Sequence, residues 1–182
     1  MIKMETFYSI PEGVTRSLKV HASVDGTALV PFDPLGILSE QLKTQGLTVE
    51  KNDDEHNLTD PCWWADHRNR FDWVIGCTMG LSQYSEHILE YGMQISKEGI
   101  AVLDRLSFIE PVAKRRTFLL THKLSNMIVL NPRPRFRAIG STKDSVTSCW
   151  FIFRSPEMWM DHTQVSFALD WDRLDQLPPL PL

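Results

Sequence analysis

Residues 71–80, Phe-Asp-Trp-Val-Ile-Gly-Cys-Thr-Met-Gly, predict a buried strand that runs directly into a tight turn. The turn carries Cys77, Thr78, Met79 and Gly80, so a thiol and a hydroxyl are its polar side chains. A thiol is a weak hydrogen-bond acceptor, and a glycine has no ring on which a ligand could stack. A backbone carbonyl at Thr78 or Met79 could still accept one hydrogen bond. The turn is therefore a candidate reactive position that has few chemical groups to work with.

Acidic residues follow two earlier apolar runs, and each has a structural and a ligand-binding interpretation. Asp33, in Val30-Pro-Phe-Asp-Pro-Leu-Gly36, fits the N-cap of a helix that has Pro34 as its first residue. Asp53 comes two residues after the strand predicted over 47–51 and belongs either to a solvated acidic turn or to a binding site. Both interpretations stay open at this point.

Three arginines alternate with other residues in Asn-Pro-Arg-Pro-Arg-Phe-Arg, residues 131–137. Proline holds such a stretch extended, so Arg133, Arg135 and Arg137 are expected to point the same way. Three guanidinium groups on one side would make a clamp for phosphate groups. The alternative is a surface loop that its charges keep soluble.

The chain has 182 residues, of which 42% are hydrophobic and 23% charged, with a formal net charge of −4. This length favours one domain, expected over residues 1–176, followed by a proline-rich tail over 177–182. No apolar run is long enough to span a membrane and no signal-peptide core begins the chain, so a cytoplasmic protein is expected. Three widely spaced cysteines and six scattered histidines indicate neither a disulfide framework nor a metal site.

The charge is unevenly distributed along the chain. Residues 105–154 hold 10 Lys/Arg and 2 Asp/Glu, whereas residues 1–104 hold 8 Lys/Arg and 16 Asp/Glu. A basic middle section on an acidic body is compatible with a local face for nucleic acid or phosphate. A solvated helix over 114–123 together with a basic loop would give the same excess of Lys and Arg without any binding function.

The order of the predicted elements favours a doubly wound, Rossmann-like α/β fold with a mostly parallel sheet. The last two strands have no clear helix between them, which predicts an antiparallel hairpin at the sheet edge. In such sheets ligands bind outside the carboxyl ends of the strands, so residues 31–36, 52–55 and 76–80 are expected around one crevice. Helices are expected over 9–21, 34–44, 61–65, 81–96 and 111–122, and strands over 27–31, 47–51, 71–75, 99–103, 126–130, 149–153 and 164–169.

Four segments resemble successive parts of one known family. Over residues 8–154 the chain resembles class I S-adenosylmethionine-dependent methyltransferases, and specifically the DNA N6-adenine methyltransferase-like group. The resemblance implies the same α/β fold and places the cofactor in the crevice. Its most specific part is the succession of Ile100–Glu110, Lys114–Arg116, Ile128–Phe136 and Ser148–Phe153.

The resemblance also implies cofactor-binding positions, and this chain departs from the family at some of them. The family's acid-Pro-x-x-Gly-x-Gly turn aligns with residues 30–36, where Pro31 and Gly36 are kept, valine replaces the acid and proline replaces the first glycine. Asp33 could stand in for the lost acid. The resemblance makes Asp53 the acceptor of the ribose hydroxyls and Asp60 the residue that contacts adenine.

The family's Asn/Asp-Pro-Pro-Tyr/Phe tetrad aligns with Cys77, Thr78, Met79 and Gly80. The side-chain acceptor for the target amine and the aromatic platform for a flipped base are both missing. The resemblance thus implies a methyltransferase-like protein that has lost catalysis and binds a nucleic acid, a nucleotide or a partner protein. The alternatives are an active S-adenosylmethionine-dependent methyltransferase acting on adenine N6 in DNA or a related amine, and a small-molecule binding protein.

Overall fold

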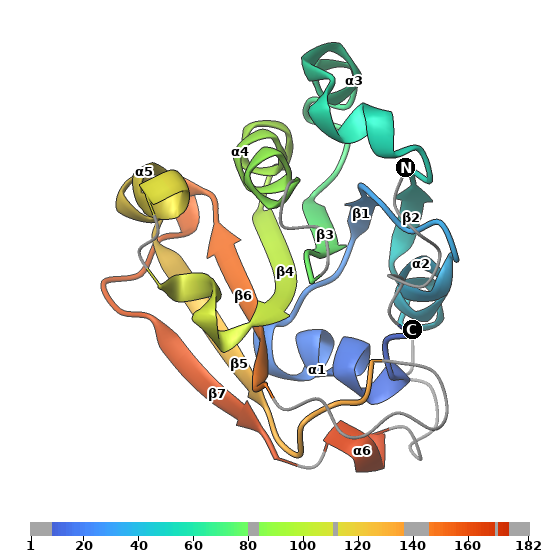
Figure 1. Ribbon diagram of the computed structural model, residues 1–182, viewed down its shortest axis with the longest axis vertical. Helices are drawn as coiled ribbons and strands as arrows, with labels where there is room; N and C mark the ends of the chain where they lie inside the picture. The colour runs from blue at the N-terminus through green and yellow to red at the C-terminus, as the bar shows by residue number, and fades with distance from the viewer. Residues whose placement is uncertain (1–8, 80–83, 111–112, 137–145, 170, 175–182) are drawn as a thin grey trace.

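A computed structural model of the chain describes residues 9–79, 84–110, 113–136, 146–169 and 171–174 (Figure 1). Helices and strands alternate along most of the sequence, as the hydrophobic pattern predicts. In chain order the elements are α1 (Glu12–Ala22), β1 (Thr27–Val30), α2 (Ile37–Thr44), β2 (Thr48–Lys51), α3 (Pro61–Asp66), β3 (Trp73–Cys77), α4 (Ser85–Ile95), β4 (Gly99–Arg105), α5 (Ala113–Thr121), β5 (Leu124–Leu130), β6 (Ser148–Arg154), β7 (Gln164–Ala168) and α6 (Trp171–Leu174).

The seven strands form one sheet in the order β2-β1-β3-β4-β6-β5-β7. The first four strands in this order pair parallel to one another. β6 runs antiparallel to both of its neighbours, β4 and β5, and β7 pairs parallel with β5. The predicted fold class, a mostly parallel Rossmann-like sheet that includes antiparallel pairing, is confirmed.

The partner predicted for the last strand is wrong. β6 and β7 do not pair, because β5 lies between them, and the antiparallel strand is β6 inside the sheet. Burial explains these positions: six of the seven β6 residues are buried, whereas β7 has one buried residue among five. A strand that is apolar on both faces is stable between two neighbours, and a half-exposed strand suits the edge.

Helices cover both faces of the sheet, and each face has its own core. One core joins the sheet to α1, α2 and α6, and the other joins it to α3, α4 and α5 (Figure 1). The indole N–H of Trp150, at the centre of β6, donates to the carbonyl of Val14 in α1 over 2.8 Å. This buried bond links the antiparallel strand to the helix that precedes the first strand. None of the described helices is both long enough and apolar enough to cross a membrane.

Two predicted helix starts are corrected by two or three residues. α1 begins at Glu12, three residues after the predicted start at Ser9; Pro11 is its N-cap and no side chain caps it. α2 begins at Ile37 because Gly36, immediately before it, adopts the left-handed conformation with φ +70°. An L-residue with a side chain is strained there, and glycine is not, which explains why the turn ends at Gly36.

Gly99 begins β4 at a point where no side chain fits. Its φ is +145°, and a Cβ atom there would lie 2.1 Å from the carbonyl oxygen of Phe153 in β6. We expect Gly99→Ala to lower the free energy of unfolding by about 3 kcal/mol or more, because backbone atoms of β6 cannot move aside. Urea denaturation followed by circular dichroism measures the change.

Gly36→Ala is the matched control for this prediction. Gly36 also has a positive φ, but the nearest atom to a Cβ placed on it is Lys51 Cε, at 4.0 Å. The control therefore carries only the conformational cost, about 1–2 kcal/mol. Equal losses in the two variants would contradict the packing of Gly99 against β6.

Candidate crevice at the carboxyl ends of the strands

Asn52 joins the ends of β1 and β2. Its backbone N–H donates to the carbonyl of Val30, and its side-chain amide donates to the carbonyl of Pro31 over 2.9 Å. The backbone N–H of Asp33 donates in turn to the carbonyl of Asn52 over 2.8 Å. These bonds hold the loops that follow the two strands side by side, as the topology predicts.

The loop after β1 also lies against β3. The ring of Pro31 is 3.7 Å from the position that a Cβ on Gly76 would occupy, which is van der Waals distance, so the loop packs directly on β3 at Gly76. The carboxyl group of Asp33 is close enough to Cys77 to affect its pKa. The structure therefore brings together segments 31–36, 52–55 and 76–79; Gly80 lies outside the described residues.

Asp33 is buried and has a structural task. Its Oδ2 atom accepts hydrogen bonds from the backbone N–H of Ser39 over 2.8 Å and from the Ser39 hydroxyl over 2.7 Å. Asp33 therefore caps the first turn of α2, although it stands three residues before the N-cap position that the backbone assigns to Gly36. The predicted N-cap position is wrong, because Gly36 is the N-cap and Pro34 lies in the preceding turn, but the Asp33 side chain still bonds to the first turn of the helix.

Asp53 and Asp60 occupy different surroundings. The Asp53 carboxylate is 70% exposed and lies 3.5 Å from the ammonium of Lys51, so it is accessible from solvent. Asp60 is the N-cap of α3, where its carboxylate accepts from the backbone N–H of Cys62 over 2.9 Å. Both acids are exposed, and each has one charged or N–H neighbour, so both carboxylates keep an oxygen available to a ligand.

The fit to the cofactor that the fold implies is thus incomplete. The exposed carboxylate of Asp53 suits hydroxyl donors such as those of a ribose. The methionine end would need an acceptor for its ammonium group from the loop after β1, where Asp33 is buried and bound to α2. The described residues fit a ribose better than they fit the whole cofactor.

Cys77 ends β3 as a neutral thiol. Burial raises its pKa to about 12, and the carboxyl groups of Asp104 and Asp33 add to this rise. The backbone N–H of Met79 donates to the sulfur and acts in the opposite direction. A thiol with this pKa is a poor nucleophile and a poor metal ligand at neutral pH.

The next two side chains of the turn point into the protein. Thr78 is buried, and its hydroxyl donates to the carboxylate of Asp104 over 2.6 Å. Met79 is buried as well, and its sulfur lies 3.8 Å from the hydroxyl of Ser148. Neither side chain is free to accept a hydrogen bond from a substrate amine.

Asp104 is a site residue that the sequence analysis missed. It lies near the carboxyl end of β4, is partly buried, and accepts hydrogen bonds from the Thr78 hydroxyl and the Arg105 backbone N–H. Burial raises its pKa, and the hydrogen bonds from Thr78 and Arg105 oppose this rise. The sequence did contain a signal for Asp104: it is an acid directly after the apolar run 99–103. Asp53 was identified as a candidate site residue because it follows shortly after a predicted strand in a similar way.

The proline-rich loop begins at the carboxyl end of β5. Because β5 has the same direction as β4, this loop leaves the sheet at the same edge as the crevice. Arg133 and Arg135 are exposed, while Pro134 and Phe136 between and after them are buried. The two described arginines therefore alternate as predicted, and Arg137 lies outside the described residues.

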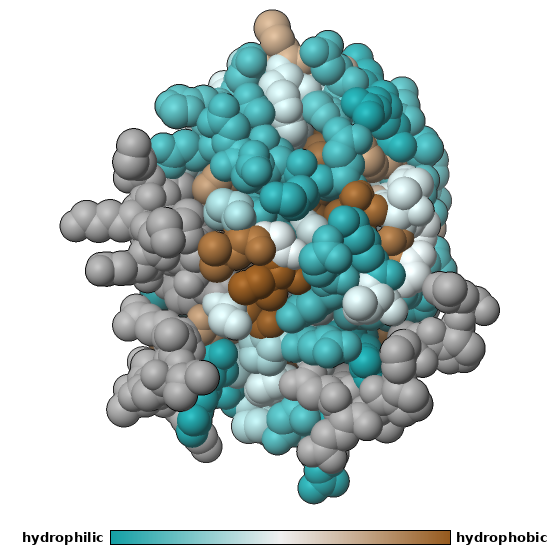
Figure 2. Space-filling model, turned by 90° about the vertical axis from the view of Figure 1, so that its right-hand side faces the viewer, coloured by the Kyte–Doolittle hydropathy of each residue, from teal (hydrophilic) through white to brown (hydrophobic). Residues whose placement is uncertain are grey.

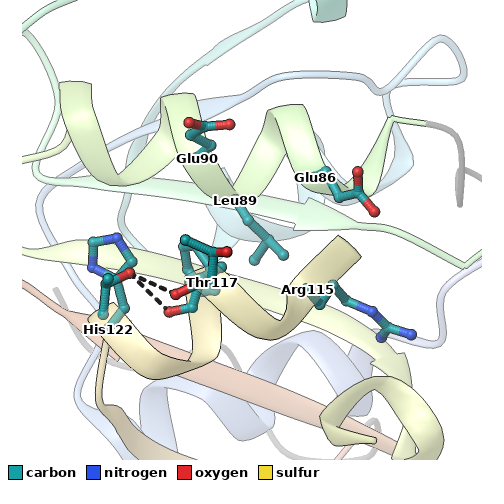
Figure 3. A pocket seen from close by; sticks show the side chains of 8 residues that line it. Glu86, Leu89, Glu90, Arg115, Thr117 and His122 are labelled. Atoms are coloured by element: carbon teal, nitrogen blue, oxygen red, sulfur yellow. Dashed lines mark hydrogen bonds between the residues drawn. The ribbon is translucent and has the colours of Figure 1, made fainter. Parts of the chain in front are cut away.

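A separate hollow of about 160 Å³ lies between α4 and α5 (Figure 3). Arg115, on its α5 side, donates to the carbonyl of Phe108 over 2.5 Å and lies 4.9 Å from the centre of the Phe108 ring. Burial lowers the pKa of His122, at the other end of the hollow, so its ring is neutral at pH 7. The hollow contains none of the predicted site residues, and across the described part of the chain no three His, Cys, Asp or Glu side chains group to hold a metal ion.

Comparisons with known proteins agree with the architecture. No protein-family model and no curated protein matches the sequence. The structure resembles a protein from Listeria monocytogenes assigned as a class I S-adenosylmethionine-dependent methyltransferase, with a TM-score of 0.54 and 12% identity over 94% of this chain and 68% of that one. It also resembles a protein from Agrobacterium tumefaciens assigned as an O-methyltransferase, with a TM-score of 0.52 and 12% identity over 88% and 86% of the two chains. At this identity the likeness shows the fold alone, which is that of class I methyltransferases.

The three cysteines should differ sharply in reactivity. Cys62 is exposed, Cys77 has a pKa raised by burial to about 12, and Cys149 is buried with a pKa raised to about 11. We expect a disulfide reagent such as DTNB to modify one thiol rapidly in the folded protein at pH 8, and all three in denaturant, because the thiolate is the reactive form. In Cys62→Ser the rapid phase should disappear, and its persistence would show that Cys77 is an activated thiol.

Proposed function

We propose that this chain is a catalytically impaired methyltransferase-fold protein that binds nucleic acid along the carboxyl edge of its sheet. The observation that carries the proposal is the state of the turn after β3. The lone pair of the adenine amino group is delocalised into the ring, and an acceptor that takes a hydrogen bond from this group makes the lone pair more available for methylation. At this turn Cys77 is a neutral thiol, and Thr78 and Met79 are buried within the protein.

Two features support nucleic acid as the ligand. Arg133 and Arg135 are exposed in one extended segment at the crevice edge, and a guanidinium group binds phosphate oxygens in a bidentate manner. Residues 105–154, which contain this segment, hold 10 of the 19 Lys and Arg residues of the chain and only 2 acids. The exposed arginines of this segment that lie in the proline-rich loop, Arg133 and Arg135, attract a polyanion, whereas Arg154 lies at the other end of β4 and β6, beside Glu98.

The role of the arginines can be measured by fluorescence anisotropy with labelled single- and double-stranded DNA at several salt concentrations. We expect Arg133→Gln/Arg135→Gln to weaken binding about tenfold and to lower the salt slope by about two, one for each lost phosphate contact. Arg68→Gln is the control. Arg68 is exposed and comes before β3, at the amino ends of the parallel strands and away from the crevice. A salt slope near zero for the unmodified protein would refute the nucleic-acid proposal.

One observation favours a second function, an active methyltransferase that uses a different acceptor. Asp104 places a carboxylate next to the turn after β3, beside Cys77 and Thr78. It could accept a hydrogen bond from a substrate amine if Thr78 released one of its oxygens. The Listeria monocytogenes protein assigned as a class I S-adenosylmethionine-dependent methyltransferase supports such an activity by its fold, although fold does not determine function.

A labelled methyl group separates the two functions. With methyl-labelled S-adenosylmethionine and adenine-containing DNA, we expect no transfer above background, and calorimetry should give a dissociation constant for the cofactor above about 100 μM, or about −5.5 kcal/mol. Transfer that is abolished in Asp104→Asn and kept in Asp53→Asn would establish the active alternative. Transfer that survives Asp104→Asn would exclude Asp104 as the acceptor and would still overturn the proposal of lost catalysis.

A further inference from the structure

Arg105 is an exposed arginine at the same edge of the sheet as the proline-rich loop. It is the last residue of β4, so it lies at the carboxyl edge to which the proposed function assigns Arg133 and Arg135. Its side chain is exposed, and its guanidinium forms no ion pair with a described residue. This guanidinium is therefore available to an anion that reaches the edge.

The strand register places Arg105 between the loop arginines and the turn after β3. Ser148 of β6 lies opposite Arg105, and the next residue of β6 lies opposite Val129, near the end of β5. Adjacent strands are about 4.8 Å apart, so the ends of β4 and β5 are about 10 Å apart across the sheet. On the other side of β4, the backbone N–H of Thr78 donates to the carbonyl of Leu103, two residues before Arg105.

The Arg105 side chain lies on the face of the sheet that α1 covers. Directly opposed residues of an antiparallel pair share a face, and the hydroxyl of Ser148, opposite Arg105, lies 3.8 Å from the sulfur of Met79. Leu103 and Phe136 both belong to the core on this face. Side chains two residues apart on a strand also share a face, so Arg105 follows Leu103. Arg105 is thus on the same side as the turn after β3 and the end of the proline-rich loop.

Exposed apolar side chains lie close to Arg105. Leu106 is 39% exposed and Val146 is 38% exposed. The backbone N–H of Leu106 donates to the carbonyl of Thr147, which holds these two segments together. A duplex covers the faces of its bases by stacking, whereas unpaired bases offer their faces to protein side chains. A surface that combines guanidinium groups with exposed apolar side chains therefore suits an unpaired strand better than a duplex.

The other half of the edge has the opposite charge. Asp53 and Asp54 are exposed after β2, and the side of the molecule on which β2 and α2 lie is mostly hydrophilic (Figure 2). Carboxylates repel the phosphate groups of a nucleic acid. A bound backbone is therefore expected over the ends of β5, β6 and β4, and not over those of β1 and β2.

We propose that Arg105 is a third phosphate-binding residue and that the nucleic acid bound at this edge is single-stranded. Its backbone runs from Arg133 and Arg135 across the end of β6 to Arg105, and its bases contact Leu106 and Val146. Beyond Arg105 this path reaches the turn after β3. The inference rests on the proposed function, because it names the class of nucleic acid and a further residue at the same surface.

Fluorescence anisotropy with a short labelled oligothymidine, alone and paired with its complement, tests both parts. We expect the single strand to bind at least about tenfold more tightly than the duplex. Arg105→Gln should weaken single-strand binding about threefold and lower the salt slope by about 0.7, for one lost phosphate contact. Arg105→Lys keeps the charge and should keep the slope. Arg68→Gln is again the control and should change neither quantity.

A second variant tests the contact with the bases. Leu106→Gln/Val146→Thr should weaken binding of the single strand about threefold and leave the salt slope unchanged, because no charge is lost. Both side chains are exposed, so the melting curve measured by circular dichroism should stay that of the unmodified protein.

The outcomes separate this inference from the function on which it rests. A protein that binds no nucleic acid would overturn both. A salt slope that falls in Arg133→Gln/Arg135→Gln and is unchanged in Arg105→Gln would overturn the role of Arg105 and keep the proposed function. Binding of the duplex that equals or exceeds binding of the single strand would overturn the single-stranded assignment.

Discussion

The antiparallel pairing of β6 with both β4 and β5 is the constraint on which the arrangement of this protein depends. Without β6, β5 would have no hydrogen-bonded connection to the parallel half of the sheet. β6 runs antiparallel to both β4 and β5. β5 therefore has the same direction as β4, and the carboxyl ends of these two strands lie on the same side of the sheet. This arrangement directs the loop with Arg133 and Arg135 to the edge where Asp53 and Cys77 lie, and it leaves β7 as the outermost strand. The burial of β6 and the bond from Trp150 to α1 hold this order in place.

At the carboxyl edge the polar groups are largely used to hold the protein together. Asn52 joins two loops, Asp33 caps α2, Asp60 caps α3, and Asp104 accepts from Thr78. Each of these bonds stabilises a loop that a ligand-binding protein would need to hold open for its substrate. These internal bonds fix the orientation of the polar groups and occupy part of their hydrogen-bonding capacity. The fold is that of class I methyltransferases, and several polar groups at this edge are bonded to the protein itself.

Much of the architecture was predictable from the sequence because hydrophobic periodicity reports burial directly. The predicted strands lie within two residues of the observed ones, and the alternation of exposure in the proline-rich loop follows from the restricted backbone of proline. The polar assignments were less complete. Asp33 was predicted as the N-cap, but Gly36 holds that position, because the left-handed turn there separates the acid from the helix; Asp33 reaches the helix only through its side-chain bond to Ser39. Asp104 was overlooked because its partner, Thr78, is 26 residues away and meets it only across the sheet.

The sequence by itself determined most of the elements, the fold class and the residue types in the turn after β3, since all three depend on residue identity and local spacing. The tertiary structure alone decided which strands are neighbours, the direction in which Thr78 and Met79 point, and which acid lies beside Cys77. The physical reason is that strand order and side-chain pairing are set by contacts between residues far apart along the chain. For β6 and β7 the local pattern is compatible with a hairpin, and the deeper burial of β6 between two strands determined the outcome.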